Sequence, residues 1–165
     1  MRAEVFRSLV ADLARSLDKP ELPVNDAQVC SIRIDAACWV HISYSDKQDA
    51  VHWTSVMCST AGRDAAALHR YLLQCNLDGA LTAGGFFGLS ELNQAVVYRY
   101  HEPLECLHAQ RFAAIFETFS ANAVRWSERL SGRIDRLAPP TASSQAAAGG
   151  LSGSPRGLDP LLNRA

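Results

Sequence analysis

The sequence lacks an excess of charge of either sign and any long apolar run. Its 165 residues contain 16 Lys and Arg against 17 Asp and Glu, which gives a formal net charge of -1. This balance provides no broad basic face for a nucleic-acid backbone. No stretch approaches the roughly 20 apolar residues of a membrane span, and Arg2, Glu4 and Arg7 interrupt the N-terminus too early for a signal peptide. We expect a cytoplasmic protein that binds no nucleic acid and inserts into no membrane.

Paired cysteines are also missing. The five cysteines are an odd number, and none is spaced as Cys-x-x-Cys; they are Cys30, Cys38, Cys58, Cys75 and Cys106. This pattern indicates neither a disulfide framework nor a zinc knuckle. His41 and His52 could face each other across neighbouring strands with Cys58 nearby, but three ligands in the correct geometry are not evident. Exposed or hydrogen-bonded histidines are the simpler interpretation, and we predict no metal and no cofactor.

Motifs that carry catalytic chemistry are absent too. The glycine-rich segment 83–88 has no Gly-Lys-Ser/Thr end and leads into a predicted strand, which is the wrong context for a phosphate-binding loop. His69 and Cys75 are six positions apart on one predicted helix, nearly two turns, so they do not share a reaction centre. We therefore predict that the protein is not an enzyme.

The composition divides the chain into two parts. Hydrophobic residues make up 48% of the sequence, which is ordinary for a globular domain that can bury a core. From Ala138 onward the chain becomes rich in Ala, Ser, Gly and Pro, and such a segment buries too little apolar surface to offset its backbone entropy. We predict one domain over 1–137 and a disordered tail over 138–165.

The first half of the domain predicts a helix followed by three strands. Residues 3–17 place their apolar side chains at helical spacing, and Pro20 ends the helix near Asp18 and Lys19. Residues 28–35, 38–44 and 50–59 are rich in β-branched and aromatic residues, and their short polar connections favour antiparallel hairpins. One sheet face should pack on a helix.

The opposite sheet face should be partly apolar. Trp39 and His41 alternate away from the apolar side chains of their strand, and a fully solvated face gives no reason for a tryptophan. Either Trp53 or Val56 of the next strand should join Trp39 there. Whether a loop or helix of the same chain covers Trp39 stays open at this point.

The second half predicts a helix, a hairpin and a long helix. Residues 63–75 form the helix, which ends at Asn76, and residues 86–89 and 94–101 form the hairpin. Apolar residues then recur three and four apart over 107–137. A single helix of that length would exceed the diameter of the domain, so we expect a stop or kink at Ser131 and Gly132. The result is an α+β fold, α-β-β-β-α-β-β-α, with a mostly antiparallel sheet packed on helices.

Residues 72–104 carry the most distinctive local pattern: LLQCNLDGALTAGGFFGLSELNQAVVYRYHEPL. A helix ending in Asn leads through a variable loop to a Gly-x-x-Gly-Leu strand entry and an alternating strand. This segment and the order of elements resemble the homodimeric class I chaperones of bacterial type III secretion, the Tir chaperone (CesT-like) family, over 3–130. The sequence departs from the family at Ser90-Glu91-Leu92, where an Asp often follows Gly-Leu, and in its long tail.

The resemblance implies a bacterial, cytoplasmic homodimer that binds the N-terminal chaperone-binding segment of a secreted effector in extended form, keeping it soluble and competent for secretion. We predict client contacts on the outer sheet face, with two residues of the first helix as further candidates: Val29, Ser31, Arg33, Trp39 and His41, then Phe6 and Val10. For the dimer we predict Leu68, Tyr71, Leu72, Val97, Arg99 and His101. The alternative function is a regulatory or adaptor module on the same fold that binds a folded partner.

Overall fold

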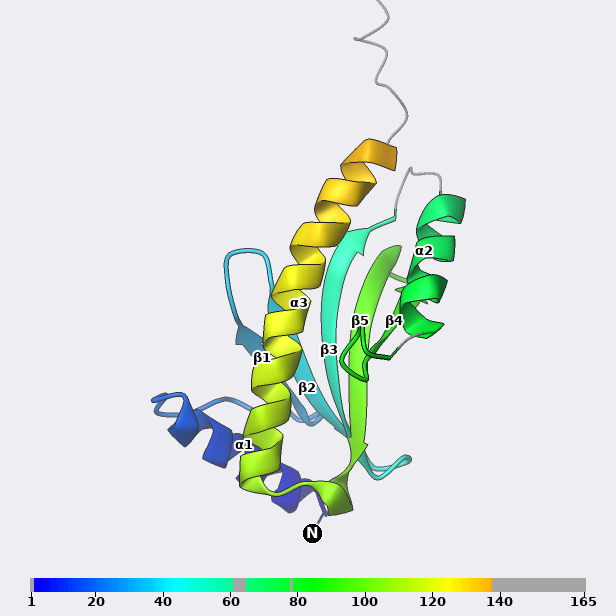
Figure 1. The fold of residues 1–165 in the computed structure, drawn as a ribbon. Coiled ribbons are helices and arrows are strands. Elements are labelled where there is room, and N and C mark those ends of the chain that lie inside the picture. Colours follow the sequence, from blue (N-terminus) through cyan, green and yellow to red (C-terminus); the bar gives the residue numbers. More distant parts are fainter. Residues whose placement is uncertain (1, 61–64, 78, 138–165) are drawn as a thin grey trace, which may run out of the picture.

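The computed structural model describes residues 2–60, 65–77 and 79–137. Its elements follow the predicted order, with one short 3-10 helix added before the last helix. They are α1 (Arg2–Ser16), β1 (Val29–Arg33), β2 (Trp39–Ser45), β3 (Ala50–Ser59), α2 (Ala65–Leu77), β4 (Phe86–Ser90), β5 (Ala95–Pro103), η1 (Leu104–Cys106) and α3 (Ala109–Leu137) (Figure 1). The tail predicted over 138–165 lies outside the described residues.

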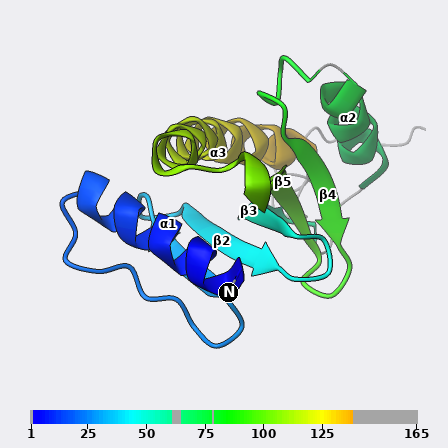
Figure 2. The same cartoon turned by 90° about the horizontal axis from the view of Figure 1, so that it is seen from below.

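The strands form one antiparallel sheet with the order β1-β2-β3-β5-β4. The long central pair is β3 and β5, and a register shift between Val56 and Cys58 lets β3 bend at its end. In both views α1 lies toward the β1–β2 side and α2 toward β4, with α3 running along the middle of the sheet (Figures 1 and 2).

The first helix ends where the sequence predicts. Asp18 has a φ of 53°, in the left-handed region, and the Lys19 amide donates to the carbonyl oxygen of Ala14 at 2.9 Å. This hydrogen bond satisfies a carbonyl that the helix end would otherwise leave open. The chain then turns back through Pro20 and reaches β1.

The last helix corrects one prediction. It continues through Ser131 and Gly132 without a stop and ends at Leu137. At about 1.5 Å per residue it is about 44 Å long, and its final turns extend past the ends of the strands (Figure 1). The expected break assumed that the helix must fit inside a sphere. A glycine inside a helix costs only about 1 kcal/mol relative to alanine, and a projecting end meets no obstacle.

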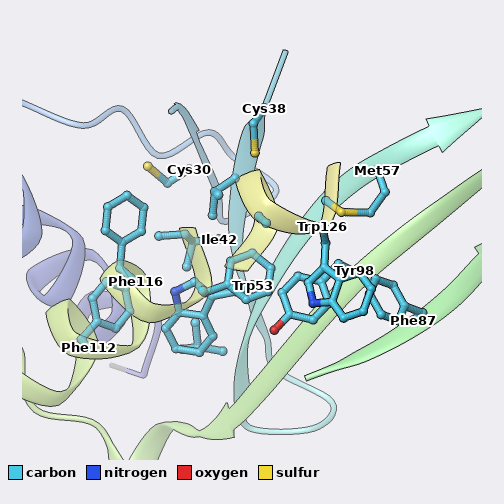
Figure 3. Close-up of a cluster of buried hydrophobic side chains, with 14 of the residues drawn as sticks. Cys30, Cys38, Ile42, Trp53, Met57, Phe87, Tyr98, Phe112, Phe116 and Trp126 are labelled. Carbon is cyan, nitrogen blue, oxygen red and sulfur yellow. The ribbon is translucent and has the colours of Figure 1, made fainter. Parts of the chain in front are cut away.

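The core lies between the three helices and one face of the sheet. Trp53 is fully buried at its centre, with ring centroids 5.4 Å from Phe112 and 5.8 Å from Tyr100. Towards β4, the Tyr98 ring stacks on Phe119 at 4.8 Å. Figure 3 shows Trp53 of β3, Tyr98 of β5 and Phe112 of α3 within this buried cluster. All three α-helices therefore pack on the same face of the sheet, and the described residues place no helix on the other face (Figure 2).

Candidate protein-binding surface

The outer face of the sheet carries no helix among the described residues. Its side chains form cross-strand rows, the longest of which runs across all five strands: Ser31, His41, Thr54, Arg99 and Phe86 are successive partners in register. We define the outer face by the residues that alternate away from the core: Val29, Ser31, Arg33, Trp39, His41, Ser43, His52, Thr54, Val56, Val97, Arg99, His101 and Phe86.

One end of the outer face is apolar. Trp39 is 45% exposed and Val56 is 46% exposed, whereas Trp53 is fully buried on the opposite face. Val56 is therefore the residue that joins Trp39, which settles the choice that the sequence left open. No loop or helix of the described residues buries the Trp39 side chain. An exposed tryptophan and an exposed valine on the same face form an apolar surface of the kind that binds other polypeptides.

Polar contacts hold the side chains around this apolar end in place. The Ser31 hydroxyl and His41 Nδ1 form a hydrogen bond of 2.8 Å across β1 and β2. Arg33 donates from Nε to the carbonyl oxygen of Asp35 at 2.9 Å and from Nη2 to that of Ala36 at 3.3 Å. These bonds tie the guanidinium to the β1–β2 turn, so its position is fixed before any partner binds.

The edge of the sheet beside Trp39 is open. The loop before β1 covers the first part of that strand. Val24 forms an isolated antiparallel bridge with Cys30, the Asn25 backbone amide donates to the Val29 carbonyl, and the Asn25 side-chain carbonyl accepts from the Val29 amide. Arg33 lies four residues further along and its backbone groups share the orientation of Val29, away from β2. No strand pairs with Arg33 on that side among the described residues. An added strand could therefore dock here, next to Trp39, its partner in register.

The opposite edge is closed at its centre. The Asn76 side chain accepts from the Phe87 amide at 2.7 Å and donates to the Phe87 carbonyl at 3.0 Å. A side-chain amide thus occupies the outward-facing backbone groups of Phe87, which would otherwise be available to an added strand. The sequence indicated that α2 ends at Asn76, but not that this residue also seals β4.

Two predicted client contacts lie in the wrong place. Phe6 and Val10 are buried against the sheet, and the Phe6 ring stacks on Tyr44 with centroids 6.1 Å apart. They belong to the stripe by which α1 packs on the core, so they offer no surface to a client. The remaining predicted contacts, Val29, Ser31, Arg33, Trp39 and His41, share the outer face.

The residues predicted for the dimer do not form one surface. Leu68 and Leu72 are buried in the core, and Tyr71 packs on Trp126 with centroids 6.4 Å apart. Val97, Arg99 and His101 lie on the outer face. The exposed apolar side chains near α2 are others, which we call the α2–β4 patch: Leu73, Leu77, Leu81 and Leu89. Sequence spacing could not separate them from the core stripe, because apolar residues occur on both sides of α2.

Within the described residues, no group of three or more His, Cys, Asp or Glu is placed to hold a metal ion. His41 pairs with Thr54, whereas His52 pairs with Ser43, so the two histidines are not direct partners. No helix in the described part of the chain has the length and apolar character needed to cross a bilayer.

Comparison with known proteins gives a consistent result. The profile of the Tir chaperone protein (CesT) family matches residues 8–127. No curated protein sequence matches the chain significantly.

Several solved structures have a similar fold. A chain of the HopA1–SchA chaperone–effector complex has a TM-score of 0.62 at 20% identity, covering 76% of this chain and 92% of that chain. A chain of the ExsC–ExsE complex has a TM-score of 0.61 at 18% identity, covering 82% and 95%. A chain of the ExoT–SpcS complex from Pseudomonas aeruginosa has a TM-score of 0.56 at 17% identity, covering 74% and 97%.

Proposed function

The chain belongs to the Tir chaperone protein (CesT) family of type III secretion chaperones, which bind effectors, and we propose that it holds the N-terminal segment of a secreted effector in extended form across the outer face of its sheet. Holding the segment extended keeps the effector soluble and competent for secretion. The observation that carries the proposal is the coincidence of an open strand edge at Arg33 with the exposed side chains of Trp39 and Val56.

An extended client needs two kinds of contact. Its backbone amides and carbonyls must be paired when they leave water, and its apolar side chains need sites that alternate with solvated positions. The edge of β1 at Arg33 supplies backbone partners, and Trp39 and Val56 supply apolar contact on the adjoining face. Ser31 and His41 add polar groups in the next row. This combination favours a strand over a helix or a folded domain as the occupant.

We also propose that two copies of the chain associate through the α2–β4 patch. Leu73 is 69% exposed and Leu77 is 89% exposed on successive turns of α2, while Leu89 is exposed on the neighbouring strand. A two-fold axis through this patch would bury the same leucines from both copies. The outer faces would then stay available, one on each copy, for a single client chain.

The proposal assigns binding and no catalytic step to the protein. Its place of action would be the bacterial cytoplasm, where an effector must be kept extended before export. Cys75 is buried within the core, where its thiol is shielded from solvent.

The experiment is capture of the natural partner from a type III secreting host. The tagged chain is recovered with its partner, and the mass of the intact complex is measured. We expect two copies of the chain with one secreted protein, bound through its N-terminal segment. A folded partner that is never exported would favour an adaptor function instead.

Two variants make the capture specific to the outer face. Replacing Trp39 with Ala should reduce the recovered partner, since the apolar contact is lost. Replacing Leu92, an exposed leucine in the β4–β5 turn, with Ala removes exposed apolar surface away from Arg33 and should leave capture unchanged. Equal loss in both variants would contradict the assignment to the outer face.

A further inference from the structure

A hollow of about 370 Å³ opens on the outer face at the end of β3 and β5 opposite Trp39. Its walls include His52 of β3, Arg99 and His101 of β5, and Phe86 of β4. His52 and His101 are partners in register, with ring centroids 5.7 Å apart. The Phe86 ring meets His101 edge-on at 6.2 Å and is itself partly exposed.

The polar groups of the hollow are not satisfied within the chain. His52 is 9% exposed, yet its Nε2 has no hydrogen-bond partner, and neither has the buried Nε of Arg99. Buried polar atoms nearly always have a hydrogen-bond partner. Two unpartnered nitrogen atoms in one hollow therefore indicate that a ligand group could accept hydrogen bonds there. Both atoms belong to residues that form its walls.

The hollow is also electropositive. Its walls include the guanidinium of Arg99, a cationic group with hydrogen-bond donors and no acceptor. Burial lowers the pKa of His52, and the charges of Arg99 and His101 lower it further. Arg99 and His101 therefore place positive charge beside His52 in the wall of the hollow.

Two carboxylates that neighbour the lining residues in the sequence, Glu102 and Asp49, have other partners. Glu102 faces the opposite side of the sheet, where it accepts hydrogen bonds from Tyr100 and Arg111. Asp49, in the turn before β3, accepts from the Tyr44 hydroxyl and pairs with Arg2. Among the described residues, no acidic side chain forms an ion pair with Arg99.

We propose that this hollow binds the carboxylate of an aspartate or glutamate in the client segment, with Arg99 as its main partner. The inference rests on the proposed function, because it places one more side chain of the same client. A guanidinium fits a carboxylate with two parallel hydrogen bonds. The Phe86 ring offers an apolar wall to the methylene groups of that side chain, which a free inorganic anion would not use. Arg99 shares its cross-strand row with Ser31 and His41, so the hollow continues the client surface.

The test selects peptides from a displayed random library on the full chain. On the unaltered chain, we expect the selected peptides to share apolar positions and one Asp or Glu at a fixed spacing from them. Peptides selected on the Arg99→Gln variant should keep the apolar positions but lose the preference for Asp or Glu. Peptides selected on the Arg99→Glu variant should carry Lys or Arg at the position where the unaltered chain selects Asp or Glu. Replacing the acidic residue of the best peptide with its amide should weaken binding to the unaltered chain roughly 10- to 100-fold, and should change binding to Arg99→Gln little.

Arg125→Glu provides the matched control, because Arg125 is exposed on α3 on the other side of the sheet. It should select the same peptides as the unaltered chain. Circular dichroism of each variant checks that the fold is kept. Peptides that share apolar positions without an acidic one, or an acidic preference that survives in Arg99→Gln, would overturn this inference and leave the proposed function intact. Failure of the unaltered chain to select any peptide would overturn both.

Discussion

Asn76 and Phe87 exchange two hydrogen bonds, with the side-chain amide of the first taking the place of a strand beside the second. The pair joins the end of α2 to β4 and occupies the outward-facing backbone groups of Phe87 at that edge. Phe87 therefore has no free backbone groups on this side that could pair with an added strand.

Replacing Asn76 with Ala should lower the free energy of unfolding by about 1–3 kcal/mol, because the backbone groups of buried Phe87 lose both partners. Urea unfolding followed by circular dichroism measures the loss. Gln74→Ala is the control, since Gln74 is exposed on the same helix, and it should change stability by no more than about 0.5 kcal/mol. Equal stability of the two variants would show that the pair with Phe87 is not structural.

Gly85 and Gly88 provide a test of close packing beneath the β4 strand. A Cβ on Gly85 would lie 2.6 Å from the ring of Tyr98, which is fully buried and donates its hydroxyl to the Thr82 carbonyl. Gly85→Ala should therefore destabilise the fold by about 1–3 kcal/mol. A Cβ on Gly88 meets nothing within 4 Å, so Gly88→Ala should be nearly neutral. A neutral Gly85→Ala would mean that Tyr98 can move aside.

The proposed dimer predicts a change of oligomeric state. Leu73→Glu with Leu77→Glu places two charges in the α2–β4 patch, where association would have to remove them from water. Sedimentation should then show a monomer where the unaltered chain is a dimer, with the fold unchanged because both side chains are exposed. Val5→Glu, at an exposed position of α1, should remain dimeric. A dimeric double variant would place the interface elsewhere.

Burial, helped by the charges of Arg99 and His101, lowers the pKa of His52 in the folded state. In the unfolded chain a histidine binds its proton near its ordinary pKa of about 6.5, so acid favours unfolding. The free energy of unfolding therefore has its full value with respect to His52 above a pH of about 6.5. It decreases as the pH falls from there toward the lowered pKa of the folded state.

Replacing His52 with Gln should therefore flatten the loss of stability between about pH 7.5 and pH 5.5, measured by urea unfolding at each pH. Thr54→Val is the control, because it changes the same strand face without removing a titrating group. An unchanged slope in His52→Gln would contradict the assigned burial.

The order of elements was predictable because each carries its own periodicity. α1 shows a helical stripe around Leu9 and Leu13, and β2 alternates Val40 and Ile42 with His41. Whether Trp53 or Val56 shares the outer face with Trp39 could not be decided from the sequence. The answer depends on the register between β2 and β3, which neither strand determines alone.

The errors in the predicted site residues have one cause, which is that periodicity identifies a face of a helix or strand but not what covers that face. Phe6 and Val10 lie on the apolar stripe of α1, and only the structure shows that both side chains are buried in the core. Leu68 and Leu72 on α2 were misassigned to an interface for the same reason, while exposed Leu73 and Leu77 were overlooked. The hollow at His52 and Arg99 combines residues from β3 and β5, which the sequence keeps 47 positions apart.

Hydrogen exchange of the captured complex, compared with the free chain, tests the central claim most directly. If the client adds a strand beside β1, the Arg33 amide, which faces away from β2, should exchange more slowly in the complex, together with the peptide that carries Trp39. The core stripe of α1 should not change. Slower exchange confined to α3 and the helical side of the sheet, with β1 unaffected, would contradict the account.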